Sequence, residues 1–241
     1  MENNVWLILI AVTSYFIGSF PTSYFVAQKM AGKDIRAVGS GNIGAMNTFR
    51  VIEAEKSSRV GLVAFLFVLV GDVGKAVLAI FIVRWLSFLQ YDLIPAFIIC
   101  SFFIILGHNY SIVFKFRSGG RGIACLMGIL LALDWRSFWV WGGTILVVLF
   151  IAEQLLVGKI RWGKIDAVFS IVGSQIVGRV IGMVVALAPI YFLDSRLLFP
   201  ILAATVLVII KHMERVRSYM RNLGVVRIGA DDIKHGTENT S

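Results

Sequence analysis

A stretch of small, turn-forming residues carries the first sign of chemistry in this chain. Residues 38–50 read VGSGNIGAMNTFR, with three glycines, a serine and two asparagines ahead of the closing Arg50. Glycines let successive backbone N–H groups form a concave nest, and such nests bind anions, phosphate above all. The sequence therefore predicts a phosphate cradle with Arg50 as a counter-charge, made by Ser40, Gly41, Asn42, Gly44 and Asn47.

A second glycine-rich loop carries the same kinds of residues. Residues 115–122 read KFRSGGRG and follow Gly107-His108-Asn109 at the end of an apolar run. Arginine forks together with nest N–H groups suit a phosphate. The second loop adds these candidate phosphate contacts: Gly119, Gly120, Arg121 and Gly122. The alternative is that the glycines of both loops only permit tight turns between membrane spans, and the residue types alone favour neither interpretation.

Several ionisable side chains lie in apolar surroundings. His108 ends an apolar run and is either a hydrogen-bonded structural group or a catalytic group. Asp72 and Lys75 are three residues apart, so they share one face of a helix and can form an ion pair. We interpret this pair as a buried support for the loops. Arg179 also lies within an apolar run, where it either snorkels or pairs with a carboxylate.

No motif for a cofactor or a metal is present. Cys100 and Cys125 lie in apolar runs, without a CxxC spacing and without a His or carboxylate placed to complete a metal site. We interpret both as small core residues. A nucleophile elbow, HExxH, GxxxxGK[ST] and DxDG are all missing from the sequence, so we expect no metal and no cofactor.

Composition places these residues in a membrane protein. Of the 241 residues, 58% are hydrophobic and 15% charged, and the mean hydropathy is +0.85. Soluble domains have about 25% charged residues, and a span needs about 20 apolar ones. We predict an all-α polytopic protein with a membrane domain over residues 1–212 and a basic tail over 213–241. The seven expected spans are about 6–26 (kinked at Pro21), 60–85, 93–114, 123–133, 138–157, 167–193 and 197–210, and surface helices are expected over 48–59 and 211–223.

The basic residues predict the orientation of these spans. Eighteen of the 23 Lys and Arg residues fall on the side that holds both glycine loops and the tail, whereas Arg84, Arg136 and Arg196 fall on the other. Cytoplasmic loops carry such an excess. We therefore expect the C-terminus in the cytoplasm and the N-terminus outside, with the first span retained rather than cleaved as a signal peptide. The net charge of +9 then reflects topology and contact with the lipid bilayer, and no nucleic-acid partner is expected.

Ordered motifs resemble those of one family. The loop GSGNIGAMN is similar to the first motif of the PlsY family of bacterial membrane acyltransferases. The resemblance extends over about residues 15–128, through residues 18–21, 72–75, 107–109 and 119–122. Met46 and Arg121 stand where the family usually has Thr and Lys. In the third motif His212 is kept, Arg215 replaces an Asn, and Gly236-Thr237-Glu238 comes later than expected.

The resemblance implies transfer of an acyl group from acyl phosphate to glycerol 3-phosphate, giving lysophosphatidic acid and phosphate without a cofactor. It implies that the phosphate lies in the nest of residues 40–44, that Arg50 and Arg121 neutralise it, and that the catalytic residues are Ser40, His108 and His212. A histidine or a phosphate oxygen of the substrate takes the proton. It also implies the bacterial inner membrane and a functional link to an enzyme that makes acyl phosphate. The alternative is a transporter or flippase for an anionic phosphorylated solute.

Overall fold

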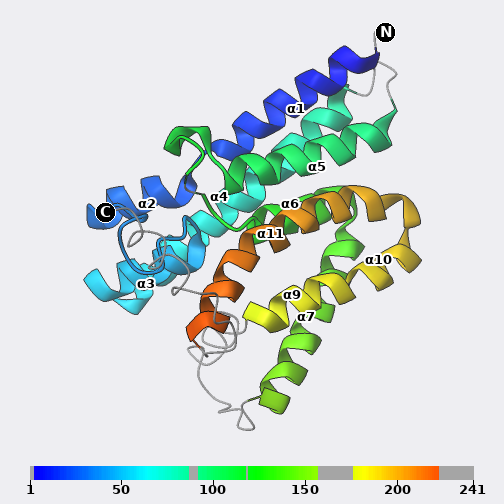
Figure 1. The fold of residues 1–241 in the computed structure, drawn as a ribbon. Helices are drawn as coiled ribbons and strands as arrows, with labels where there is room; N and C mark the ends of the chain where they lie inside the picture. The colour runs from blue at the N-terminus through cyan, green and yellow to red at the C-terminus, as the bar shows by residue number, and fades with distance from the viewer. Residues whose placement is uncertain (1–2, 87–91, 118, 157–175, 223–241) are drawn as a thin grey trace, which may run out of the picture.

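The computed structural model describes residues 3–86, 92–117, 119–156 and 176–222, and these residues form helices and turns with no β-strand among them. Figure 1 shows the helices as a bundle in which α5 lies among α1, α4, α6 and α11. The elements are α1 (Asn3–Ser19), α2 (Thr22–Ala31), α3 (Ala45–Glu55), α4 (Ser58–Trp85), α5 (Leu93–Asn109), η2 (Ile112–Phe114), α6 (Ile123–Leu133), α7 (Trp135–Leu156), α9 (Ile176–Val185), α10 (Leu187–Leu193), η3 (Ser195–Leu197) and α11 (Leu198–Asn222).

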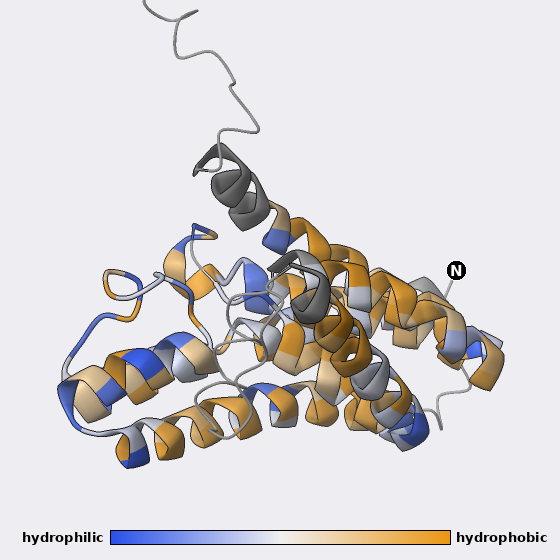
Figure 2. Ribbon diagram, turned by 90° about the horizontal axis from the view of Figure 1, so that it is seen from below, coloured by the Kyte–Doolittle hydropathy of each residue, from blue (hydrophilic) through white to orange (hydrophobic). Residues whose placement is uncertain are grey.

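The all-α membrane architecture is confirmed. Five segments of the described chain are long and apolar enough to cross a membrane, namely Val5–Ala31, Ser58–Trp85, Leu93–Phe114, Trp135–Ala152 and Ser195–Met213. Two further apolar helical stretches, Ile123–Leu133 and Gly178–Leu193, are shorter than these five. The total of seven membrane spans therefore stays a prediction. Figure 2 shows hydrophobic residues along most of the bundle and hydrophilic ones gathered mainly at the end that holds α3.

The expected kink at Pro21 is a complete break between α1 and α2. Proline has no N–H and disfavours the helical conformation of the residue before it, so α1 ends at Ser19 and α2 begins at Thr22. Two carbonyls at this break have side-chain donors: Ser111 Oγ donates to the Ser19 carbonyl at 2.7 Å and Lys75 Nζ donates to the Phe20 carbonyl at 3.0 Å. The break is therefore stabilised by distant parts of the chain.

Helix α1 packs closely on α5 because a glycine lies on each side of the contact. A Cβ on Gly18 would overlap the Ile104 carbonyl, and a Cβ on Gly107 would overlap the Tyr15 carbonyl. Small residues allow such backbone approach between membrane helices. The crossing brings the end of α5, with His108, beside the break after α1.

Two surface helices differ from their predicted bounds. The helix expected over residues 48–59 is α3 and ends at Glu55, because the Ser57 hydroxyl caps α4 by accepting from Val60 N at 3.4 Å. The helix expected over 211–223 is not separate, since α11 continues to Asn222 and no Gly or Pro interrupts it there. The predicted domain boundary after residue 212 lies within α11 and stays a prediction. Of the span predicted over 167–193, residues 167–175 lie outside the described chain, and the remainder forms α9 and α10.

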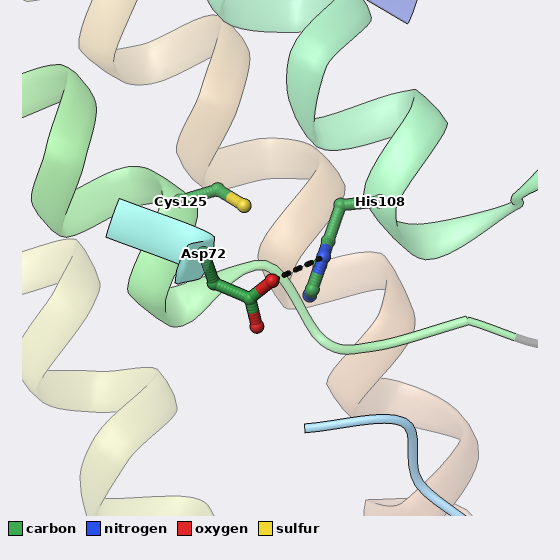
Figure 3. Close-up of side chains that lie close together, drawn as sticks. All are labelled: Asp72, His108 and Cys125. Carbon is green, nitrogen blue, oxygen red and sulfur yellow. Dashed lines mark ion pairs between the residues drawn. The ribbon is translucent and has the colours of Figure 1, made fainter. Parts of the chain in front are cut away.

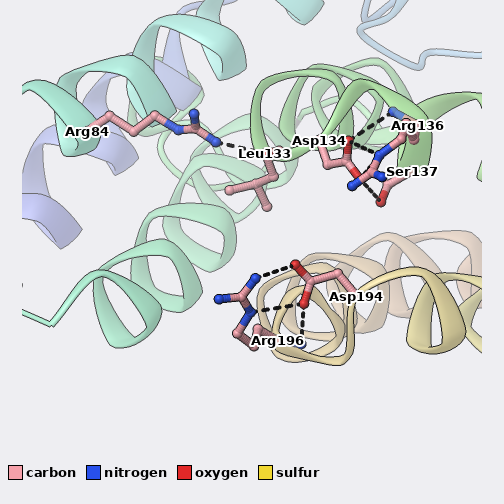
Figure 4. A network of polar contacts seen from close by, with 7 residues as sticks. All are labelled: Arg84, Leu133, Asp134, Arg136, Ser137, Asp194 and Arg196. Atoms are coloured by element: carbon pink, nitrogen blue, oxygen red, sulfur yellow. Dashed lines mark hydrogen bonds and ion pairs between the residues drawn. The ribbon is translucent and has the colours of Figure 1, made fainter.

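Three arginines gather at the far end of the bundle from α3. Arg84 Nη2 donates to the Leu133 carbonyl at 2.9 Å, while Arg136 and Arg196 fold back onto Asp134 and Asp194 (Figure 4). The hydrogen bond from the Arg196 guanidinium holds the pKa of the Asp194 carboxyl below its ordinary value. The sequence analysis predicted that these three arginines lie on the membrane side opposite most of the other basic residues. Their position at one end of the bundle fits that prediction.

The α1–α5 crossing makes a prediction about stability. Replacement of Gly107 by Ala forces the two backbones apart and should lower the free energy of unfolding by about 1 to 3 kcal/mol. Thermal unfolding in detergent measures this as a lower Tm. Gly74→Ala is the matched control, because a Cβ at Gly74 meets nothing within 4 Å. Equal melting temperatures for the two variants would contradict the close crossing.

Candidate active site

A cavity of about 270 Å³ opens where the two glycine loops meet the helices. Ten of the residues predicted from the sequence line it: Ser40, Asn42, Gly44, Asn47, Arg50, Asp72, His108, Arg121, Gly122 and His212. Gly119 and Gly120 line a smaller neighbouring cavity, which Asp72 and His108 also reach. Gly41 and Lys75 line neither of these two cavities. The fold therefore brings together residues that are up to 172 positions apart in the chain.

Asn47 organises the first loop from the start of α3. Its Oδ1 accepts from Ser40 N at 2.8 Å. Its Nδ2 donates to the carbonyls of Ile35, Val38 and Asn42 at 3.1 to 3.2 Å. With both ends of the amide engaged and the residue 2% exposed, Asn47 fixes the shape of the first glycine loop.

Arg36 ties the same loop to the bundle. Its guanidinium lies 4.7 Å from the centre of the Phe114 ring and 5.6 Å from that of Tyr24. It also pairs with Asp34 at 2.6 Å, and this hydrogen-bonded partner lowers the pKa of the Asp34 carboxyl. Ile35, between these two residues, is fully buried. The loop is thus anchored by a buried side chain and by an arginine stacked on aromatic rings.

Most backbone N–H groups of the nest predicted over residues 40–44 form hydrogen bonds within the protein, whereas we expected them to face a ligand. The N–H groups of Ser40, Gly41, Ile43 and Gly44 already donate within the protein. Helix α3 begins at Ala45, and its N-cap residue Gly44 offers no side-chain cap. The first N–H groups of a helix have no intrahelical acceptor, and its N-terminus attracts anions. Ala45 and Met46, the first two residues of α3, line the cavity, so the helix N-terminus opens onto it.

The second loop is joined to the first and pressed against His108. Ile43 N donates to the Gly119 carbonyl at 3.4 Å, and Gly120 N donates to the His108 carbonyl at 2.9 Å. A Cβ on Gly120 would overlap Nε2 of His108. Glycine is therefore required at position 120 because the backbone there approaches the imidazole closely. This role differs from that of a glycine that only permits a tight turn.

The predicted ion pair between Asp72 and Lys75 is confirmed, and it includes His108. Lys75 Nζ lies 2.9 Å from Asp72 Oδ1 and 2.9 Å from His108 Nδ1. Thr22 Oγ1 donates to the same carboxylate oxygen at 3.2 Å. All three charged or titratable side chains are buried. The pair therefore connects the break after α1 to the imidazole in the cavity wall.

The expectation that no His or carboxylate accompanies a cysteine is wrong for Cys125. Its Sγ lies with Asp72 and His108 in a group whose ligand atoms are all within 4.8 Å of one another (Figure 3). Such a set can hold a metal ion by distance alone. In this structure the Lys75 ammonium contacts both Asp72 and His108, so these two side chains already have a cationic partner. Cys100 and Cys125 are both fully buried core residues, as predicted.

Other cavity-lining residues were not assigned to the site by the sequence. Arg179 of α9 lines the cavity. The sequence did mark this position, because a charged residue within an apolar run is rare and usually functional. An apolar wall comes from α4 and the start of α6: Phe65, Leu69, Ile123, Ala124 and Met127. These residues carry no sequence signal because core and cavity walls use the same side chains. The cavity thus has cationic groups and an apolar wall within reach of one another.

The role of Asn47 leads to a test of loop order. Asn47→Asp places a carboxylate oxygen against three carbonyl oxygens, so the loop should open, and amide hydrogen exchange over residues 35–44 should rise at least about tenfold. Exchange with mass-spectrometric readout in detergent measures it. Ser58→Ala, which removes an exposed hydrogen bond to Glu53, should leave exchange unchanged. Unaltered exchange in Asn47→Asp would contradict the bracing role.

Comparisons with known proteins identify the family of this chain. A family model described as "Glycerol-3-phosphate acyltransferase" matches residues 8–222. A glycerol-3-phosphate acyltransferase of Coxiella burnetii is 33% identical over 207 residues, which are 86% of this chain and 91% of the relative. One of Clostridioides difficile is 31% identical over 185 residues, 76% of this chain and 86% of the relative.

Two solved structures share the fold. They are crystal structures of PlsY, an integral membrane glycerol 3-phosphate acyltransferase, in a glycerol 3-phosphate form and a lysophosphatidic acid form. The TM-scores are 0.62 and 0.58 at 21% and 20% identity. The first match covers 94% of this chain and 98% of the other, and the second 92% and 95%. From the family match and the sequence relatives together, this chain belongs to the glycerol-3-phosphate acyltransferase family.

Proposed function

We propose that this protein transfers an acyl group from acyl phosphate to glycerol 3-phosphate, and releases lysophosphatidic acid and phosphate. The observation that carries this proposal is the cavity in which two arginine-bearing glycine loops face an apolar wall. Such a site suits a donor with a phosphate at one end and a hydrocarbon chain at the other. The relatives named as glycerol-3-phosphate acyltransferases favour the acceptor and favour an enzyme over a transporter or flippase.

The donor phosphate is placed at the start of α3. The N–H groups of Ala45 and Met46 supply hydrogen bonds, and the helix dipole favours negative charge there. Arg50 and Arg121 add charge-assisted contacts from the two loops. Ser40 and Asn42 line the same part of the cavity and contribute polar side chains. The acyl chain then follows the wall made by α4 and α6 toward the lipid.

The reaction needs positioning more than activation, because an acyl phosphate is already a reactive anhydride. The glycerol hydroxyl attacks the acyl carbonyl, the new C–O bond forms, and the bond to the phosphate oxygen breaks. His212 Nδ1 lies 2.7 Å from the Val208 carbonyl, which only accepts, so Nδ1 donates and Nε2 carries the lone pair. His212 and the departing phosphate are thus the two acceptors for the hydroxyl proton. Arg179, which lines the cavity, supplies positive charge for the second substrate.

The proposed location is the bacterial inner membrane, with the glycine loops in the cytoplasm. Glycerol 3-phosphate is a water-soluble anion, whereas the acyl chain belongs in lipid, so the site must open at the membrane surface. The donor must come from a reaction that forms an acyl–phosphate anhydride, which is the basis for a functional link to such an enzyme.

The donor assignment can be tested with purified protein in detergent. Acyl phosphate, but not acyl coenzyme A or acyl carrier protein, should support lysophosphatidate formation and phosphate release from glycerol 3-phosphate. Ser40→Ala and Arg121→Ala should lower kcat/KM about 100-fold or more, the usual cost of removing a donor to a developing charge. Arg121→Lys keeps the charge and should retain more activity than Arg121→Ala.

Arg117→Ala is the matched control for Arg121→Ala. Arg117 is exposed on the same loop and does not line the cavity, so this variant should keep wild-type rates. Turnover from acyl coenzyme A alone, or wild-type rates in Arg121→Ala, would overturn the proposed donor or its site.

The orientation makes a separate prediction. A cysteine introduced at Arg136 should react with a membrane-impermeant maleimide in intact spheroplasts, whereas one at Lys56 should react only after lysis. Both positions are exposed, and the native Cys100 and Cys125 are buried. The opposite labelling pattern would place the glycine loops outside.

A further inference from the structure

The hydrogen bonds within the buried group of Asp72, Lys75 and His108 determine which nitrogen of the His108 imidazole carries the proton. The Lys75 ammonium contacts both of the other groups, 2.9 Å from Asp72 Oδ1 and 2.9 Å from His108 Nδ1. The direct distance from His108 Nδ1 to Asp72 Oδ1 is 3.8 Å, too long for a hydrogen bond. The hydrogen-bond partner of His108 Nδ1 in this group is therefore the lysine and not the carboxylate.

Hydrogen-bond polarity fixes the state of the imidazole. An ammonium has three N–H donors and no acceptor. Those of Lys75 have three acceptors in reach: Asp72 Oδ1, the Phe20 carbonyl at 3.0 Å and His108 Nδ1. Because Nδ1 of His108 accepts from Lys75, a neutral imidazole must carry its proton on Nε2. His108 thus presents an N–H group at Nε2.

The opposite outcome would follow without the lysine. A histidine beside a buried carboxylate donates its Nδ1 proton to that carboxylate, and Nε2 is then left with a lone pair that can act as a base. His212 has the same polarity with a backbone partner, because its Nδ1 donates to the Val208 carbonyl at 2.7 Å. Both histidines line the same cavity, so it contains one Nε2 donor and one Nε2 acceptor.

We infer that Lys75, held by Asp72, is a positioning residue that makes His108 a hydrogen-bond donor to the acyl carbonyl oxygen during transfer. This inference rests on the proposed function and deepens it. As the hydroxyl attacks, negative charge develops on that oxygen, and a preset N–H stabilises it without transferring a proton. Gly120 completes the arrangement, because the absence of a Cβ there leaves room for Nε2.

The test that does not depend on activity is the tautomer of His108. Protein labelled with ¹⁵N in the imidazole rings has three histidines, at 108, 212 and 235, and His108→Gln and His212→Gln assign the signals. In wild type at neutral pH we expect a protonated Nε2 and an unprotonated Nδ1 at His108. A proton on Nδ1, or on both nitrogens, would overturn the inference while leaving the donor assay to decide the proposed function by itself.

Variants of the positioning residues test the consequence for catalysis. Lys75→Met lets His108 donate from Nδ1 to Asp72, so the tautomer should switch and kcat should fall about 100-fold with KM for acyl phosphate changed less than threefold. In the double variant Asp72→Asn with Lys75→Met, the Asn amide replaces the ammonium as a donor to Nδ1. The Nε2 proton and at least a tenfold part of kcat should return.

Gly74→Ala, one residue from Lys75 and without contacts within 4 Å of its new Cβ, is the control and should match wild type. Unchanged kcat in Lys75→Met would overturn the inference. So would a double variant that regains the Nε2 proton without regaining rate, since the charge of Lys75 and not the tautomer would then matter. If Lys75→Met does not fold, the ¹⁵N spectrum of the wild-type protein still tests the inference through the tautomer of His108.

Discussion

The Lys75 ammonium, buried among Asp72, His108 and the Phe20 carbonyl, is the contact on which the rest of the site depends. Its three partners come from α4, from α5 and from the break between α1 and α2. Removal of one member of a buried ion pair leaves an uncompensated charge, at a cost of about 3 to 5 kcal/mol. The same ammonium donates to the Phe20 carbonyl at the break between α1 and α2, so one side chain stabilises the break and orients the imidazole.

Both glycine loops are held by neighbouring parts of the chain in addition to their own turns. The Asn47 amide, on the first turn of α3, pairs with four backbone groups of the first loop. The second loop is fixed by the His108 carbonyl and by its bond to Ile43. Most of the nest N–H groups serve this internal order, whereas the first N–H groups of a helix such as α3 have no intrahelical acceptor. The proposed phosphate site therefore uses N–H groups other than those that order the loop.

The position of the cavity suits a reaction between a lipid and a soluble anion. Cationic groups from both loops, with Arg179 of α9, lie beside an apolar wall from α4 and α6. Charged side chains are costly within a bilayer, and their concentration at the end of the bundle with α3 keeps them near water (Figure 2). The three arginines at the opposite end fold onto carboxylates and a carbonyl (Figure 4), so each of them has a partner close in the sequence or on a neighbouring helix.

The sequence by itself determined the features that depend on neighbouring residues. Apolar runs predicted α6 at residues 123–133 and the ends of α4 within two residues, and the spacing of Asp72 and Lys75 predicted their ion pair. Tertiary structure decided which distant groups meet. The Lys75–His108 bond, the proximity of Cys125 to Asp72 and the place of Arg179 in the cavity arise from helix packing, including the crossing that Gly18 and Gly107 allow. Hydrophobic patterning and an ion pair on one helix involve residues within one or two helical turns, so the sequence shows them directly. The hydrogen-bond partner of a buried side chain instead depends on which other helix packs beside it.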